Sequence, residues 1–266
     1  MSEHPVRYWQ SLTTVEARQL AARDPVVVLP LAAIEQHGPH LPLSTDLDIG
    51  LGLLARAFEQ LPEDFPAWVL PPQAVGSSRE HARFPGTVSL APDLLSGVIV
   101  AHGAALAACG VRRLVLCNSH GGNGQVLDAA GLRLRQELGL LVVKASYFEL
   151  PRPEGLDLPA SEWRHGLHGG AVETAMMLHL RPDLVRTDQI ANARSLGEEL
   201  EASMRRLSPD GVVSFSWLAG DLNPTGVTGD ARRADAAMGR RLVAHYGDAL
   251  AEVIRDAKAF PLERLA

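Results

Sequence analysis

The sequence predicts an α/β fold with a mainly parallel central sheet and helices on both faces. Apolar runs rich in β-branched residues alternate along the chain with amphipathic helical patterns, which is the order of repeated strand–helix units. These runs are continuously apolar, as in strands that are buried on both faces. The chain has 266 residues, of which 46% are apolar, so it has enough apolar material for a substantial core.

The elements are predicted from these patterns in chain order. The four apolar runs expected to be strands are 26–31, 67–70, 114–117 and 140–145. Thr13 and Glu16 have capping-box spacing and open a short helix. The longer helices are expected at 48–61, 92–109, 125–138, 171–180 and 231–258, and Gly110, Gly139 and Pro182 mark three of their ends. The stretches 71–92, 146–170 and 208–230 lack a regular pattern, and loops this long in one domain are commonly functional or disordered.

Composition and charge exclude several classes of protein. The apolar content excludes a disordered chain, a collagen-like fibre and a disulfide-stapled miniprotein, and we expect one domain over residues 1–266. The net charge of −6 gives no basic footprint, so neither a nucleic acid nor a membrane surface is expected as a partner. The apolar stretch 98–108 is interrupted by His102 and Gly103 and is too short to span a bilayer.

Cysteine usage and the N-terminal segment predict a cytoplasmic protein. Cys109 and Cys117 lie in apolar segments without metal-site spacing, so both are expected to be buried thiols in a reducing compartment. The first ten residues lack the apolar region of a signal peptide.

The first predicted strand is followed by a polar segment that contains three candidate metal ligands. Glu35 and His37 are two residues apart, so in extended backbone their side chains point to the same side. Asp46 follows after a short loop. Two carboxylates and an imidazole at the end of a strand suit a divalent metal ion. The alternative is an irregular polar loop with a surface histidine.

The third predicted strand ends in a second polar segment, 118–124. His120 follows directly on the strand, and parallel topology places it at the same edge of the sheet as the first motif. Gly121 and Gly122 permit a tight turn or a close approach of the backbone to a ligand. A glycine-rich anion cradle is the alternative, although the segment has neither a GxGxxG pattern nor a Walker lysine.

A third cluster contains His168 and Glu173. His168 precedes two glycines, which suits a catalytic imidazole, and Trp163 in the same loop is a candidate substrate contact. Glu173 falls in the first turn of a predicted helix, where the alternative is that it serves only the helix dipole.

A fourth cluster, Ser78, Glu80 and His81, follows the second predicted strand and is a candidate pocket wall. Alternatively, Glu80 forms a salt bridge with Arg79 or Arg83 that holds this loop.

Together, these motifs resemble the creatininase (creatinine amidohydrolase) family. The segment 35–46, which begins Glu-Gln-His-Gly-Pro-His, is similar to the first signature of that family, and 118–123 is similar to the second. His168, Gly169 and Gly170 with Glu173 and Thr174 resemble the third. Segments 76–87 and 221–230 also fit, in family order.

The resemblance implies a three-layer αβα fold, a homo-oligomer that is commonly a hexamer, and two divalent metal ions. The metal is commonly zinc, with manganese or iron as alternatives. The implied metal ligands are Glu35, His37, Asp46 and His120, with Asp46 as the bridging carboxylate. His168 stands where creatininase has a histidine proposed to transfer a proton.

Two positions depart from creatininase proper. Gly122 stands where that enzyme has a glutamate ligand, and Leu167 stands where it has a second glutamate. Glu173 is therefore the candidate for the missing ligand and, beside His168, for a catalytic role. Because of these departures, creatinine itself is not the expected substrate.

The resemblance implies a hydrolase that acts on non-peptide C–N bonds, with small peptides as an alternative substrate. The expected reaction is cleavage of an amide, cyclic amide or formamide of a small molecule by a metal-activated water. Six residues are candidates for substrate binding: Ser78, Glu80, His81, Gly121, Gly122 and Trp163. A peptidase of the mycofactocin-maturation type and a pyrimidine formamide deformylase are alternatives within the family. A non-catalytic relative that binds a small ligand, and a nucleotide- or phosphate-binding protein, are alternatives of other classes.

Overall fold

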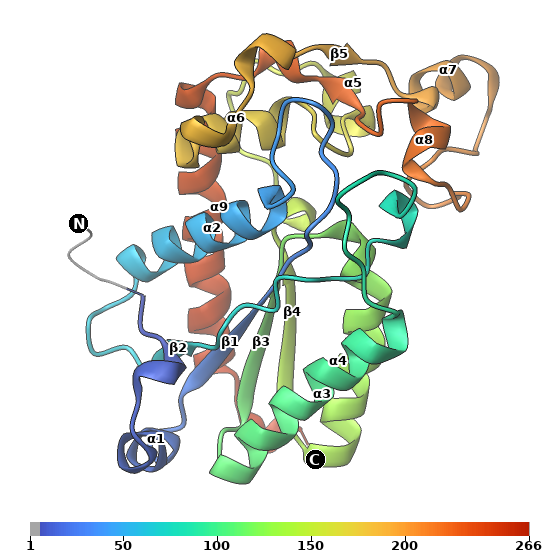
Figure 1. The fold of residues 1–266 in the computed structure, drawn as a ribbon. Coiled ribbons are helices and arrows are strands. Elements are labelled where there is room, and N and C mark those ends of the chain that lie inside the picture. Colours follow the sequence, from blue (N-terminus) through green and yellow to red (C-terminus); the bar gives the residue numbers. More distant parts are fainter. Residues whose placement is uncertain (1–5, 266) are drawn as a thin grey trace.

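A four-stranded parallel sheet forms the centre of the computed structural model, which describes residues 6–265 (Figure 1). The strand order is β2 (Ala67–Val69), β1 (Val26–Leu31), β3 (Arg113–Asn118) and β4 (Leu141–Ser146). Leu31, Asn118 and Ser146 share one register position, so β1, β3 and β4 end at the same edge. The first ten residues, in which the sequence predicts no signal peptide, are described only in part, because residues 1–5 lie outside the described residues.

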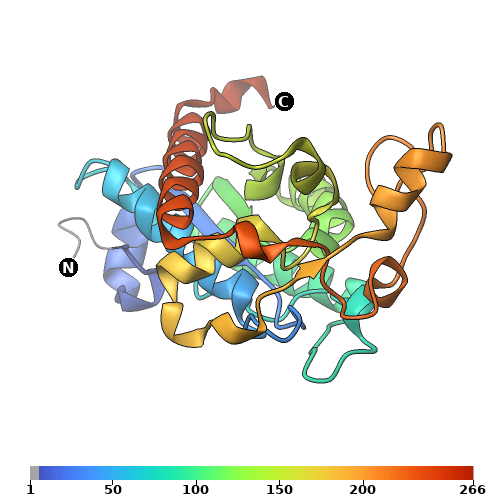
Figure 2. The ribbon, with the colours of Figure 1, turned by 90° about the horizontal axis from the view of Figure 1, so that it is seen from above.

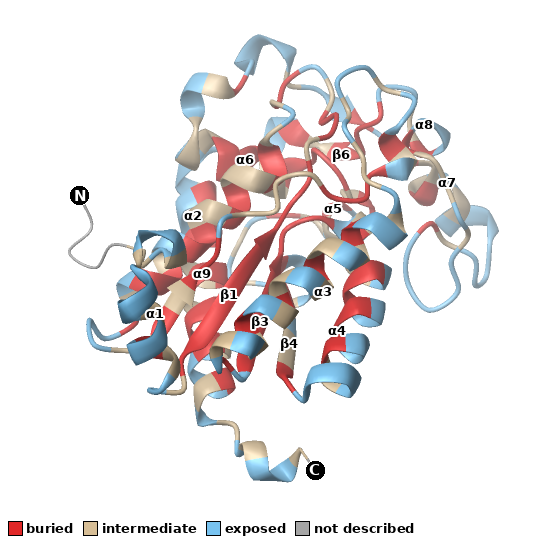
Figure 3. Cartoon of the chain, turned by 60° about the horizontal axis from the view of Figure 1, so that its bottom comes forward, coloured by how far each residue is buried: buried red, intermediate tan, exposed pale blue. Residues whose placement is uncertain are grey.

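Helices cover both faces of this sheet and complete the predicted three-layer αβα fold. On one face, Val27 and Leu29 of β1 pack in a core with α3 (Pro92–Cys109) and α4 (Gly124–Leu138). On the other face, Val26 and Val28 pack with the helices α2 (Thr45–Gln60), α6 (Ala171–Leu180) and α9 (Ala236–Ala259). Every residue of β1 is buried, which explains its continuous apolar sequence (Figure 3).

Local signals fix several helix ends where the sequence predicts them. Thr13 and Glu16 form the capping box of α1 (Thr14–Ala21), with the Thr13 N–H donating to Glu16 Oε2 at 2.7 Å. Gly110 follows α3 with a φ of 97° and Gly139 follows α4 with a φ of 69°. Both glycines adopt the left-handed conformation in which a side chain is disfavoured.

Two helix starts differ from the prediction by more than one residue. The last helix begins at Ala236 rather than at 231, because residues 231–233 form a 3-10 turn and Asp235 caps the N–H of Met238 at 2.7 Å. Helix α2 begins at Thr45 rather than at 48. Asp46 therefore lies in the first turn of a helix and not in a loop.

Short elements that the sequence did not reveal lie around the carboxyl edge of the sheet (Figure 2). They are α5 (Ala160–His165), β5 (Asn192–Ala193), α7 (Leu196–Ser203), α8 (Ala219–Leu222) and β6 (Gly229–Asp230). Strands β5 and β6 pair antiparallel. Two of the predicted irregular stretches, 146–170 and 208–230, thus contain short regular elements.

Helix α3 is longer than the apolar stretch 98–108 that the sequence analysis considered too short to span a bilayer. Its 18 residues have a mean hydropathy of 1.4, and by length and composition alone such a helix could cross a membrane. In this fold, Leu95, Ile99 and Leu106 pack against the sheet. The opposite side exposes small apolar residues and Leu94, which is 57% exposed.

Candidate metal centre

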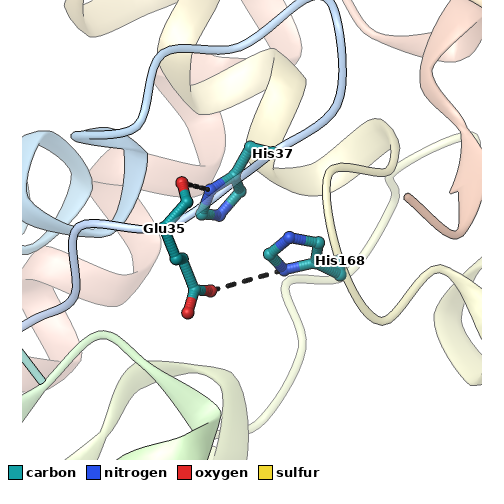
Figure 4. A group of neighbouring side chains, drawn as sticks. All are labelled: Glu35, His37 and His168. Atoms are coloured by element: carbon teal, nitrogen blue, oxygen red, sulfur yellow. Dashed lines mark hydrogen bonds and ion pairs between the residues drawn. The ribbon is translucent and has the colours of Figure 1, made fainter. Parts of the chain in front are cut away.

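Glu35 and His37 lie just beyond the end of β1 and are 1% and 0% exposed (Figure 4). The His37 Nδ1–H donates to the backbone oxygen of Glu35 at 3.1 Å. Because a carbonyl only accepts, this bond places the proton on Nδ1 and leaves the lone pair on Nε2. Nε2 is therefore free to bind a cation.

Asp46 presents its two carboxylate oxygens to two histidines. Oδ1 lies 3.3 Å from His37 Nε2, and Oδ2 lies 3.3 Å from His120 Nδ1. The carboxylate comes from the first turn of α2 and is 2% exposed. Asp46 thus joins the end of β1 to the end of β3.

His120 follows β3 and is fixed from behind by a backbone carbonyl. Its Nε2–H donates to the oxygen of Ser77 at 2.9 Å, which leaves the Nδ1 lone pair facing the centre. Nδ1 lies 3.3 Å from Glu35 Oε1 as well as from Asp46. The structure therefore brings the first two sequence motifs together at the edge where parallel strands end.

Glu173 serves two purposes at the start of α6. Its Oε2 accepts the N–H of Gly169 at 2.6 Å, which is a helix-terminus role. The same oxygen lies 3.9 Å from His37 Nε2. The capping interpretation and the ligand interpretation from the sequence are thus both compatible with its position.

The donor set fits divalent cations. Among the described residues, the Glu35 Oε2, His37 Nε2 and Asp46 Oδ2 atoms are buried without a hydrogen-bond partner. Orphaned buried polar atoms are costly, and a cation bound to them would remove that cost. Three candidate groups have ligand atoms close enough together to hold a cation: His37, Asp46 and Glu173; Glu35, Glu80 and His120; and Glu35, His37 and His168. Asp46 belongs to the first group and also lies 3.3 Å from His120 of the second. Nitrogen and carboxylate donors of this kind suit zinc, manganese or iron.

The charges of the centre also favour a cation. Burial opposes the charged form of His37, but Asp46, Glu173 and Glu35 outweigh it and raise the pKa of His37 to about 9. Burial also opposes ionisation of Glu35, yet the charge and hydrogen bond of His120 hold the pKa of its carboxyl well below the usual range. The acidic cluster thus attracts positive charge to the nitrogen that faces Asp46.

His168 lies between two other imidazoles. Its ring centroid is 4.1 Å from that of His37 and 4.2 Å from that of His81. Its Nε2–H donates to Gln36 O at 2.6 Å, so the Nδ1 lone pair faces Glu35 Oε1 at 3.7 Å (Figure 4). Burial and the two histidines hold the pKa of His168 well below its usual value. His168 is therefore a neutral base that points into the centre.

Glu162 of α5 holds the loop that presents His168. Its two oxygens accept the N–H groups of Ala171 and Asp230, each at 2.7 Å. A Cβ built on Gly166 or Gly170 would lie within 2.6 Å of Glu162 Oε1, so the carboxylate occupies space that only glycine leaves free. This buried carboxylate ties the start of α6 to β6.

A cavity of about 240 Å³ opens onto the metal ligands. Gly121 and Trp163, two of the six candidate substrate-binding residues, line it together with His168 and Glu173. The other four, Ser78, Glu80, His81 and Gly122, are not among its lining residues.

Ser78, His81 and Gly122 lie behind the candidate ligands instead. Glu80 forms a group with Glu35 and His120 whose ligand atoms could hold a metal ion, and its Oε1 lies 3.6 Å from His120 Nε2. Ser78 Oγ lies 3.3 Å from His120 Nε2, and His81 Nε2 lies 3.6 Å from Glu35 Oε1. A Cβ at Gly122 would lie 2.4 Å from Glu80 Oε1, so the Glu80 carboxylate fills the space beside this glycine.

The sequence analysis did not single out the aromatic and basic part of the cavity wall. Tyr147, Phe148 and Arg152 follow β4, and Tyr246 comes from α9. The three residues after β4 were open to prediction because ligands bind beyond the carboxyl ends of parallel strands. Tyr246 could not be predicted in this way, because it lies in the middle of a helix of 24 residues.

Comparison with known proteins gives a consistent result. The sequence profile of the creatininase family, described as creatinine amidohydrolase, matches residues 10–254. The mycofactocin precursor peptide peptidase of Mycolicibacterium smegmatis is 36% identical over 254 residues, which cover 94% of this chain and 92% of that protein.

Solved structures of creatininases share the fold. One described as "Creatininase Mn" has a TM-score of 0.74 at 29% identity. The match covers 94% of this chain and 98% of that chain. A mutant creatininase of the Zn-Zn type has a TM-score of 0.72 at 30% identity. The match covers 94% of this chain and 97% of that chain.

The αβα fold, with buried histidines and carboxylates at the carboxyl edge of its sheet, defines the class as hydrolases with a site suited to a divalent metal. The chain belongs to the creatininase (creatinine amidohydrolase) family, which confirms the resemblance of the motifs. It is a hydrolase of that family.

Proposed function

We propose that this protein hydrolyses a C–N bond of a peptide at a centre of two divalent cations. Glu35, Asp46 and His120 would hold one cation, and His37, Asp46 and Glu173 the other. The observation that carries the proposal is the position of Asp46, whose two oxygens face two different histidine nitrogens at 3.3 Å each. Zinc and manganese are the proposed metals because the creatininase structures are described with them.

Two cations, when bound, lower the pKa of a water molecule and polarise a carbonyl oxygen. The chain's own residues position and move the protons. His168 Nδ1 accepts a proton and returns it to the leaving nitrogen, because its other nitrogen is committed to Gln36 O. Gly121 lines the cavity, and in this proposal its backbone N–H would stabilise developing negative charge on oxygen.

A peptide is the proposed substrate because the peptidase relative is 36% identical along nearly the whole chain. The aromatic wall formed by Tyr147, Phe148, Trp163 and Tyr246 supports this, since it suits an apolar side chain. A cyclic amide is the second candidate, favoured by the similarity to creatininase structures. Restriction to non-peptide bonds stays a prediction, as does the formamide deformylase alternative.

The test is hydrolysis by zinc-loaded and manganese-loaded protein of three separate substrates: a defined peptide mixture, creatinine and a cyclic dipeptide. Mass spectrometry would identify the products. Cleavage of peptides by the wild type and none by Asp46→Asn is the expected result. Cleavage of the cyclic amides alone would establish the second candidate, and no cleavage of any substrate by metal-loaded protein would contradict both.

We also propose a homo-oligomer, a hexamer by family resemblance, in the cytoplasm. The outward side of α3 supports the oligomer because it exposes Leu94 and Ala101 beside other small residues. Two free thiols, Cys109 and Cys117, support a reducing compartment.

A further inference from the structure

A second cavity adjoins the one over the metal ligands. Its volume is about 370 Å³, and it shares Arg152, Trp163 and Asp210 with the metal cavity. The rest of its wall comes from α5, α7 and the segment after α7. The three shared residues thus form a wall common to the two cavities, and we call the outer cavity the basic groove.

The basic groove is rich in arginine. Its four arginines are Arg152, Arg164, Arg205 and Arg206. Only two carboxylates face them, and one of these, Glu201, already pairs with Arg164 at 3.1 Å and with His165 at 2.9 Å. Asp210 is the other. This excess of positive charge stands out in a chain with a net charge of −6.

Three of these arginines have no ion pair within residues 6–265, namely Arg152, Arg205 and Arg206. Arg152 is nevertheless held in place. Its guanidinium lies 5.0 Å from the centre of the Trp163 ring, and its Nη2 donates to Trp163 O at 2.9 Å. One edge of the guanidinium is thus fixed, and the remaining N–H groups are available to a planar anion such as a carboxylate.

Apolar side chains accompany these charges. Met204 and Leu207 line the basic groove and are 48% and 41% exposed. Aliphatic surface beside unpaired guanidinium groups suits a peptide, which presents both side chains and carboxylates. The wall that the basic groove shares with the metal cavity favours a peptide whose scissile bond lies over the proposed metal ligands.

We infer that the basic groove binds carboxylate groups of a peptide substrate and so selects acidic peptides, with Arg152 as the anchor nearest the scissile bond. This inference rests on the proposed peptide hydrolysis. The carboxylates can come from Glu and Asp side chains or from the free C-terminus of the peptide. Both present the same planar anion to Arg152.

The test is binding of fluorescein-labelled hexapeptides to metal-loaded protein, measured by fluorescence anisotropy, with the integrity of each peptide checked by mass spectrometry. The peptides have the sequence Glu-Glu-Leu-Glu-Glu-Leu or carry Gln or Lys in place of Glu, each as a free acid and as a C-terminal amide. The variants are Arg152→Gln and the double variant Arg205→Gln with Arg206→Gln. The matched control is Arg18→Gln with Arg240→Gln, two exposed arginines outside the groove.

The Glu peptide should bind about 10-fold more tightly than the Gln peptide. Each groove variant should weaken its binding by about 3- to 10-fold, and the control by less than about 2-fold. A preference for free acids over amides, without a preference for Glu, would assign the groove to the C-terminal carboxylate and still support the inference. Equal binding of all peptides, or equal losses in groove and control variants, would overturn it.

The same peptides separate this inference from the proposed function. Cleavage that is independent of peptide charge would contradict the basic groove and leave peptide hydrolysis standing. Charge-dependent binding without cleavage of any peptide would support the groove and contradict the proposed hydrolysis.

Discussion

At the scale of single residues, backbone carbonyls decide what the histidines can do. His37 donates to Glu35 O, His120 to Ser77 O and His168 to Gln36 O. Each bond fixes the tautomer, and each leaves a nitrogen lone pair directed at the buried carboxylates. Two of these lone pairs belong to the ligand groups around Asp46, and the third belongs to the proposed proton carrier.

Replacement of His168 by Asn should separate chemistry from metal binding. His168 is not one of the five proposed ligands, so the metal content should stay at the wild-type level, and a loss of metal would assign it to the candidate group that it forms with Glu35 and His37. Turnover should fall by about 10²- to 10⁴-fold because the proton carrier is lost. Elemental analysis and steady-state kinetics on the same preparation check this. His179→Asn, at an exposed histidine of α6, is the control, and full turnover by His168→Asn would contradict the proposed role.

Much of the candidate site could be predicted from the sequence because several of its candidate ligands follow predicted strands. Glu35 and His120 come just after apolar runs, and parallel topology alone places them at one edge. The positions of Ser78, Glu80 and His81 could not be predicted, because whether a loop lines a cavity or supports a ligand depends on tertiary packing. The basic groove could not be predicted, because its arginines come from segments that are far apart in the sequence. Only the fold brings these arginines together.

At the scale of elements, Glu162 is the link that holds α6 in place. It accepts N–H groups from the start of α6 and from β6. Since α6 also carries Glu173, the geometry of one candidate ligand depends on a buried carboxylate eleven positions earlier in the sequence.

Glu162→Gln should lower stability, because the amide NH₂ group cannot accept one of the two N–H groups. An unsatisfied buried donor costs about 1–3 kcal/mol, which corresponds to a fall in Tm of about 3–8 °C for a chain of this size. Thermal unfolding followed by circular dichroism measures the shift. Glu154→Gln, at an exposed position, is the control, and an unchanged Tm in Glu162→Gln would contradict the clamp.

Asp24 connects the turn before β1 to β3 and α9. It accepts from Arg113 Nε at 2.9 Å and from Lys258 Nζ at 3.2 Å. Partial burial opposes its ionisation, but these hydrogen bonds outweigh that effect and lower the pKa of Asp24. A lowered pKa stabilises the folded state above the unfolded value of about 3.9, and this contribution is lost as the pH falls through the folded value.

Asp24→Asn should therefore destabilise the protein by about 1 kcal/mol at pH 7, and the difference should shrink below about pH 4. Urea unfolding at both pH values tests this. The exposed Asp157→Asn should show neither effect. A constant difference between Asp24→Asn and wild type across this pH range would contradict the ionic contribution.

The elements themselves were largely predictable from the sequence. The four strands and the packed helices follow from apolar runs, capping signals and helix-ending glycines. The short elements between 146 and 230 were not predictable, because α5, α7 and α8 have only four to eight residues each. Helices this short depend on tertiary contacts rather than on their own propensity.

At the scale of the whole molecule, the outward side of α3 supports the proposed homo-oligomer. One side of this helix packs on the sheet, while the other exposes Leu94 and small residues in a helix of high mean hydropathy. The prediction of one domain over 1–266 stays a prediction, as does the hexamer.

Ala101→Glu on the exposed side of α3 should shift the assembly toward smaller species, because a charge in an apolar interface is costly. Light scattering coupled to size-exclusion chromatography measures the mass. Ala22→Glu, at an exposed position just after α1, is the control. The same mass for Ala101→Glu and wild type, or a wild-type monomer, would contradict an interface on α3.

The central claim is that Asp46 joins two ligand groups, and metal content per chain tests it most directly. Elemental analysis of gently purified wild type should find about two divalent ions, and Glu173→Ala about one. Glu173→Gln keeps an acceptor for the Gly169 N–H but not the carboxylate, and it should also hold about one ion. Loss of an ion in this variant would show that Glu173 acts as a ligand and not only as a helix cap. A wild type without tightly bound metal after supplementation, or a Glu173→Ala protein with the wild-type content, would contradict the two-ion centre.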